Sequence, residues 1–165
     1  MLSYLTLGAF ADARAIGASI SDAEIEEILQ QKRRDPASAV VSVYYQMRAG
    51  TIVHTDWVRN LADWFTMIPD GAVQYGWCLL RQPSPDNMTA RKYFLTAAER
   101  GIPMYSYGVR LLYDGLNLLA ERFSGDVEIA SAFRGVRRIA AVIDWNASVT
   151  SLALTGDPSV VAFEG

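Results

Sequence analysis

The stretch Ala90 to Gly115, ARKYFLTAAERGIPMYSYGVRLLYDG, decides the predicted fold. Its first half places apolar side chains at helical spacing and ends at Gly101, where a glycine commonly closes an α-helix. Ile102-Pro103 then breaks the chain, because the residue before a proline is held out of the α region. A second apolar pattern continues to about Arg122. The stretch therefore predicts a helix over 89–100, a tight break and a helix over 103–122.

The proline of this break is one of three at nearly equal intervals. Pro36, Pro69 and Pro103 are 33 and 34 residues apart, and the Ile before Pro69 recurs before Pro103. The following positions recur as well: four residues on lie Val40, Val73 and Tyr107, and eight residues on lie Tyr44, Trp77 and Leu111. A period near 34 residues with two helices in each unit is typical of stacked helical hairpins. We therefore expect antiparallel helix-pair repeats of the α-solenoid kind over 36–122.

The quoted stretch resembles a Sel1-like or tetratricopeptide-type repeat unit. Two small residues, Ala97 and Ala98, precede a glycine break and a following helix, as in that family. The resemblance covers residues 36–122 and implies an α-solenoid that grips peptides or proteins and has no chemistry of its own. The first unit departs from the pattern, because Asp63 and Trp64 stand where Ala97 and Ala98 stand in the next. Its two helices are therefore expected to pack less closely.

A second resemblance is carried by a string that begins Asn60-Leu-Ala-Asp-Trp-Phe. It runs through Ile68-Pro-Asp-Gly to Trp77-Cys-Leu-Leu-Arg81, and Asp144-Trp-Asn follows later. These segments are similar to helical regions that accompany bacterial caspase-like peptidases. The similarity implies a regulatory or recognition part of a peptidase system rather than the peptidase itself.

The whole chain, residues 1–165, is predicted to be a single, mostly α-helical domain of about seven helices. A chain of this length buries roughly 70% of its unfolded surface without a disulfide or metal. Besides the two helices above, helices are predicted over 21–34, 36–50, 55–68, 69–82 and 127–143. Ser21-Asp-Ala-Glu24 opens the first of these with a capping box. A short β-like tail over 148–165, extended or folded as a hairpin, ends the domain.

Charge and composition exclude several classes of partner. The formal net charge is −3 and the pI is about 5.1, which argues against binding to a phosphate backbone. The arginines Arg134, Arg137 and Arg138 are interpreted as a solvated helix face. The apolar start of the chain is interrupted by Asp12 and Arg14 before it reaches membrane-spanning length. We therefore predict no nucleic acid and no membrane partner, and the single cysteine favours the cytoplasm.

The residues do not combine into a pattern of catalytic or metal-binding chemistry. One histidine and one cysteine cannot form a zinc motif, and Cys78 lies between apolar neighbours as a small hydrophobe would. No phosphate loop or nucleophile elbow follows a strand, so no cofactor is expected. The alternative is a small enzyme that uses the carboxylates of Asp56, Asp63 or Asp144 in a cleft between helices.

The aromatic residues suggest a binding surface, because adjacent aromatic residues on a helix point about 100° apart and cannot all face the core. Tyrosine, tryptophan and arginine dominate the hot spots of protein interfaces. The predicted partner-binding set is Tyr45, Trp57, Tyr75, Arg81 and Tyr105. We therefore predict a non-catalytic module that binds or assembles a protein or peptide partner. A self-assembling structural subunit remains a further alternative.

Overall fold

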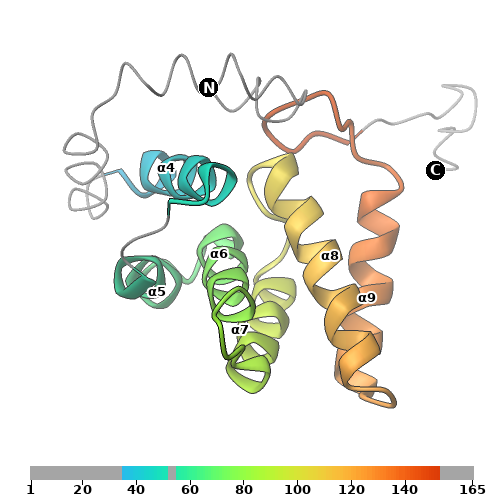
Figure 1. Ribbon diagram of the computed structural model, residues 1–165. Coiled ribbons are helices and arrows are strands. Elements are labelled where there is room, and N and C mark those ends of the chain that lie inside the picture. The colour runs from blue at the N-terminus through green and yellow to red at the C-terminus, as the bar shows by residue number, and fades with distance from the viewer. Residues whose placement is uncertain (1–34, 52–54, 153–165) are drawn as a thin grey trace, which may run out of the picture.

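The computed structural model describes residues 35–51 and 55–152. These residues form six α-helices, which Figure 1 labels. In chain order they are α4 (Pro36–Ala49), α5 (Thr55–Trp64), α6 (Pro69–Leu80), α7 (Asn87–Arg100), α8 (Ser106–Arg122) and α9 (Val127–Ala140). The predicted mostly α-helical fold is confirmed for this part of the chain. None of these six helices is long and apolar enough to cross a membrane.

Local residues set where most of these helices begin and end. Three helix starts are capped by an aspartate: Asp35 accepts from the Ser38 N–H, Asp86 from the Thr89 N–H and Asp126 from the Ile129 N–H. Proline is the first residue of α4 and α6, where its missing N–H needs no partner. Gly50 closes α4 with φ of 72°, a left-handed conformation that favours glycine.

Helix α6 is the centre of the packing and contacts α4, α5, α7 and α8. The α4 and α5 helices lie on one side of α6 and α7, and α8 and α9 lie on the other (Figure 1). Helix α9 packs against both α8 and α7. Each helix therefore contacts the next along the chain, and α4, α6, α7, α8 and α9 also contact a helix two places away.

Hydrogen bonds join α6 to its neighbours at a constant offset in sequence. Three α6 or adjacent side chains donate to backbone carbonyls 34 residues away: Gln74 Nε2 to Val40 (2.8 Å), Trp77 Nε1 to Leu111 (2.8 Å) and Arg81 Nη1 to Met47 (3.1 Å). Positions that correspond in the repeat, or lie one residue from it, are therefore bonded between α6 and its neighbours α4 and α8.

Phe94 of α7 is fully buried where two helices leave room for its ring. A Cβ atom on Gly76 of α6 would lie 2.8 Å from this ring, and a Cβ atom on Gly115 of α8 would overlap it. The Trp77 ring packs edge-on against Phe94, with 6.0 Å between the ring centroids. The two glycines thus allow one phenylalanine to hold three helices together.

Three helix boundaries differ by three or more residues from the sequence prediction. Helix α5 ends at Trp64, not at 68, because residues 65–68 form a turn and Ile68 is extended before Pro69. Helix α8 begins at Ser106, not at 103, because the Met104 N–H donates to the Asp70 carboxylate at 2.7 Å. Helix α9 ends at Ala140, since Ile143 pairs with a later extended residue.

The C-terminal strap, residues 142–152, includes the described part of the predicted tail, residues 148–152. It forms isolated antiparallel bridges from Val149 to Tyr105 and from Leu152 to Ile143. The Thr150 N–H donates to the Met104 carbonyl at 2.8 Å. The strap therefore packs on the start of α8. The predicted helix over 21–34 and the tail beyond residue 152 lie outside the described residues.

An ion pair joins the start of α7 to the start of α9, and its pH dependence can be tested. Arg91 donates to Asp126 at 2.6 Å and to Glu128 at 2.5 Å. The hydrogen bond from Arg91 lowers the pKa of Asp126 from its ordinary 3.8 to about 2. Because the folded-state pKa is depressed, the pair contributes stability above pH 4, and this contribution disappears as the pH falls toward 2.

We therefore expect Arg91→Gln to lower the urea midpoint of unfolding at pH 6 and to lower it much less at pH 2.5. The matched control is Arg59→Gln, because Arg59 forms a longer, exposed pair with Asp63 at 3.5 Å. Urea titrations of both variants at the two pH values measure the difference. An equal loss for Arg91→Gln at both pH values would show that the ion pair does not stabilise the fold.

Candidate functional site

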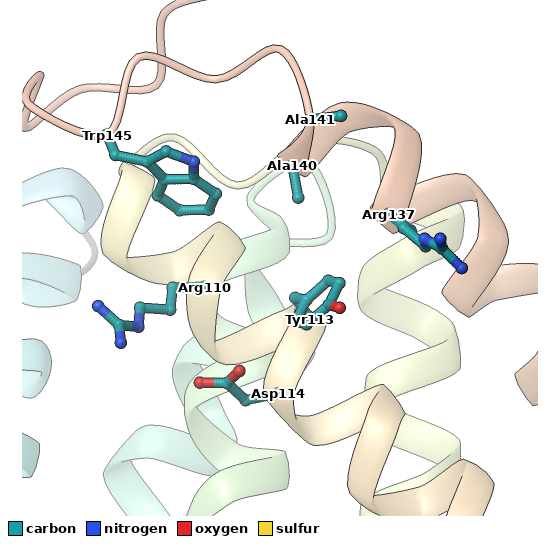
Figure 2. A pocket seen from close by; sticks show the side chains of 7 residues that line it. All are labelled: Arg110, Tyr113, Asp114, Arg137, Ala140, Ala141 and Trp145. Carbon is teal, nitrogen blue, oxygen red and sulfur yellow. The ribbon is translucent and has the colours of Figure 1, made fainter.

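A cavity of about 530 Å³ lies between α8, the end of α9 and the C-terminal strap (Figure 2). Its lining combines cationic, aromatic and small side chains: Arg110, Tyr113, Asp114, Arg137, Ala140, Ala141 and Trp145. A volume of this size suits one or two side chains of a partner or a small ligand.

Helix α8 supplies three neighbouring side chains of the cavity. Arg110, Tyr113 and Asp114 are spaced three and four residues apart, so they share one helix face. Burial raises the pKa of the Asp114 carboxyl, and the nearby Arg110 charge partly opposes this shift. Tyr113 packs on Phe133 of α9, with ring centroids 5.1 Å apart. The tyrosine ring is therefore held in place between α8 and α9.

Helix α9 supplies a cation and a small-residue wall. Arg137 lines the cavity, and Ala140 and Ala141 leave the space between α9 and the strap unfilled. Arg134 and Arg138 lie exposed on the same helix, so the predicted solvated basic face is found beside the cavity. The opening is therefore bordered by positive charge.

Trp145 lies at the edge of the cavity, with its ring turned toward Ala140, and is 40% exposed (Figure 2). A local turn shapes this part of the strap, since the Asn146 N–H donates to the Asp144 carboxylate at 3.0 Å. The strap is fixed to α8 as well: the Ser106 N–H donates to the Ser148 carbonyl at 3.2 Å, and the Ser106 hydroxyl donates to the Ala147 carbonyl. The indole is thus presented by a segment bonded on both sides.

A buried carboxylate stabilises the turn before α8, to which the strap is bonded. Asp70 is fully buried and accepts hydrogen bonds from the Tyr44 hydroxyl (2.8 Å) and the Met104 N–H (2.7 Å). Burial raises the pKa of Asp70, and the two hydrogen bonds oppose this shift. A Cβ atom on Gly108 would lie 2.7 Å from the Asp70 carboxylate. Asp70 therefore ties α4 and α6 to the turn that carries the strap.

The predicted partner-binding residues do not gather at this cavity. Tyr45, Trp57 and Tyr75 are half-buried against the core, and Tyr75 lies edge-on to Tyr93 with 4.6 Å between centroids. Tyr105 is only 9% exposed and packs edge-on against Tyr44, so its ring is part of the core. Arg81 is exposed and lies over the Trp77 ring, 5.7 Å from its centroid. The five residues are spread over four helices and their ends.

Arg81 lines a second cavity, of about 420 Å³, at the ends of α4 and α6. The other lining residues are Met47, Gly50, Thr55, Cys78, Gln82 and Pro83. Cys78 is buried, and burial raises the pKa of its thiol to about 11. A thiol with this pKa is protonated at neutral pH, so it lacks the thiolate that nucleophilic catalysis requires.

The carboxylates of the enzyme alternative lie apart from one another. Asp56 and Asp63 are exposed on α5, and Asp63 accepts a hydrogen bond from the Tyr93 hydroxyl at 2.8 Å. Asp144 follows α9 and caps the turn in the strap. Among residues 35–51 and 55–152, no three His, Cys, Asp or Glu residues are grouped to hold a metal ion.

Sequence reasoning did not select Arg110, Tyr113, Asp114 or Trp145 as site residues. The signal in the sequence was limited to the three-residue and four-residue spacing on α8 and to the aromatic residue in Asp144-Trp-Asn. Arg137 was recognised only as part of a basic helix face. The cavity depends on contacts between residues that are far apart in the chain.

Comparison with known proteins gives one match. No curated protein and no solved structure is significantly similar to the chain. A single family model covers residues 1–157, which is nearly the whole sequence. The chain therefore belongs to the Y4kD C-terminal domain family.

Proposed function

We propose that this domain is a non-catalytic protein-binding module made of three stacked helix pairs, α4–α5, α6–α7 and α8–α9, with the Arg110–Trp145 cavity as its binding site. The observation that carries the proposal is this open cavity, because arginine, tyrosine and tryptophan side chains line it together. These residue types provide most of the binding energy at protein interfaces.

The constant offset of hydrogen bonds supports the stacked-pair arrangement. The bond from Trp77 to Leu111 joins α6 to α8 across 34 residues, which is the interval between Pro69 and Pro103, and the bond from Gln74 to Val40 joins α6 to α4 one residue beyond the interval of 33 between Pro36 and Pro69. Stacked units that contact only their neighbours produce such recurring contacts. The arrangement is the one that the resemblance to Sel1-like and tetratricopeptide repeats implies.

The outer face of α8 supports a role as the end of the stack. Arg110 corresponds to Gly76 and Val43 in the two earlier pairs, and Asp114 corresponds to Leu80 and Met47. The four earlier residues are buried, whereas both α8 residues are exposed. A polar outer face is typical of the terminal unit of a helical stack. A partner, rather than a further helix pair, fits this face.

Site-specific photocrosslinking in the native host tests the proposal. We expect a photoreactive p-benzoylphenylalanine in place of Val142, which is 42% exposed beside the cavity, to form an adduct with a specific protein. The control position is Met88 at the start of α7, which is exposed and distant in the fold. Adducts of the same kind from both positions, or none from Val142, would overturn the proposed binding site.

The identity of the adduct also separates the broader proposals. A peptidase would support a regulatory or recognition role in a bacterial peptidase system. A second copy of the chain would favour the self-assembling subunit, and sedimentation at several concentrations would then show a larger species. The name of the family, a C-terminal domain, fits a module that serves a larger protein.

One observation favours the enzyme alternative, and it concerns Asp114 rather than the three predicted aspartates. Its carboxyl lies in the cavity and has a raised pKa, as a general acid or base would have. The pKa of this carboxyl, measured by NMR titration, distinguishes the enzyme from the binding module. A pKa two or more units above the ordinary value favours acid–base chemistry, and a smaller shift favours the binding module.

A further inference from the structure

We propose that the Arg110–Trp145 cavity recognises an acidic segment of a partner protein, in which an aspartate or glutamate side chain lies beside an aromatic or large apolar residue. This inference rests on the proposed protein-binding function and specifies its ligand. The carboxylate would be held by Arg137, and the apolar side chain would lie between Trp145 and Tyr113.

The charge distribution around the cavity supports an acidic ligand. The chain has a net charge of −3, yet four arginines lie in or beside this cavity: Arg110, Arg134, Arg137 and Arg138. Within residues 35–51 and 55–152, the guanidinium groups of the three α9 arginines form no hydrogen bond or ion pair. Arg91 of α7, in contrast, is held by two carboxylates. The α9 guanidinium groups are therefore available to pair with carboxylates from outside, which they bind in bidentate geometry.

The apolar part of the cavity supports an aromatic or large apolar side chain next to that carboxylate. Trp145 exposes 40% of its surface, and the small side chains of Ala140 and Ala141 line the same cavity. Figure 2 shows the Trp145 ring on the strap and the Tyr113 ring between α8 and α9. An inserted ring would contact both aromatic groups and displace water from them.

The Asp114 carboxylate favours a peptide ligand over a nucleic acid. Its carboxylate lines the same cavity and would repel a nucleic-acid backbone, which carries a charge on every phosphate. A peptide can instead place its acidic side chain at Arg137 and donate a hydrogen bond from an uncharged backbone N–H to Asp114. The combination of arginines, aromatic rings and one acceptor therefore matches an acidic peptide better than a backbone that is charged at every unit.

Fluorescence anisotropy with labelled peptides tests the inference on the full chain. The probe alternates glutamate and phenylalanine over six residues, and the two control peptides alternate lysine with phenylalanine and glutamate with serine. A labelled oligothymidylate tests the nucleic-acid alternative. We expect the glutamate–phenylalanine peptide to bind at least tenfold more tightly than the other three probes.

Arg137→Gln is expected to weaken this binding about tenfold, which corresponds to about 1.4 kcal/mol. Trp145→Ala is expected to weaken it by a similar factor. Arg59→Gln, a loss of the same charge from exposed α5, is the matched control and should leave the affinity unchanged. Because Arg137 and Trp145 are exposed, thermal melts should confirm that the variants remain folded.

Equal affinity for the four probes, tighter binding of oligothymidylate, or no effect of Arg137→Gln would overturn the inference. Failure of the acidic peptide together with a specific protein adduct at Val142 would reject only the acidic ligand. Failure of both experiments would reject the protein-binding function itself.

Discussion

Replacing Phe94 by alanine is expected to lower the free energy of unfolding by about 3–5 kcal/mol, the range found for buried phenylalanines. The ring is fully buried between α6 and α8, and its truncation leaves a cavity beside Gly76 and Gly115. Trp77 also loses its edge-on partner. Urea unfolding followed by circular dichroism measures the change.

Two comparisons identify the cause of this loss. Phe65→Ala removes a half-buried phenylalanine and should have a clearly smaller effect. Gly115→Ala should also destabilise the wild-type domain, because its Cβ would overlap the Phe94 ring. In the Phe94→Ala background, Gly115→Ala should lower the free energy of unfolding much less, since the ring that its Cβ would overlap is absent. Simple addition of the two losses would show that the ring and the glycine do not depend on each other.

Asp70→Ala is also expected to have a large effect, a loss of roughly 2–6 kcal/mol, because it leaves two donors of about 1–3 kcal/mol each without an acceptor. These donors are the Tyr44 hydroxyl and the Met104 N–H, and Tyr44 is itself fully buried. Thermal or urea unfolding at pH 5 measures the loss. Asp70→Ala should also loosen the strap, because Met104 bonds to Thr150 through its carbonyl.

Asp70→Asn is the conservative control, because an amide oxygen can still accept a hydrogen bond from the Met104 N–H. It also removes a carboxylate whose pKa is raised by burial. A raised folded-state pKa means that the folded domain holds this proton more tightly, so wild-type stability declines as the pH rises above 4 through the raised pKa. The difference between wild type and Asp70→Asn should therefore shift in favour of asparagine with rising pH. A difference independent of pH would contradict a raised pKa for Asp70.

The helical part of the fold could be predicted because its signals are local. Pro36 and Pro69 begin helices as predicted, and Gly50 closes α4 in the left-handed conformation. The start of α8 could not be predicted, because Pro103 suggested a helix start that the bond from Met104 to Asp70 moves to Ser106. That hydrogen bond joins residues 34 positions apart, and the sequence near Pro103 does not indicate it.

The candidate site was much less accessible to sequence reasoning. Arg110 and Trp145 meet only because the strap bonds to Met104 and Ser106. Helical spacing can show that adjacent aromatic residues point in different directions, but it cannot tell which one faces outward. Tyr105, for example, turns inward onto Tyr44, while Trp145 in an irregular segment stays partly exposed. Whether Tyr45, Trp57, Tyr75 and Arg81 contact a partner remains a prediction.

The labelling rate of the buried Cys78 thiol can be used to measure local unfolding at the end of α6. Because this is the only cysteine and its pKa is about 11, an alkylating reagent meets almost no thiolate while α6 is packed. The rate of covalent labelling at neutral pH should therefore follow the fraction of molecules in which the end of α6 has separated from α4. Mass spectrometry of labelled chains would then rank all the variants above by local opening, with no dye or added tag.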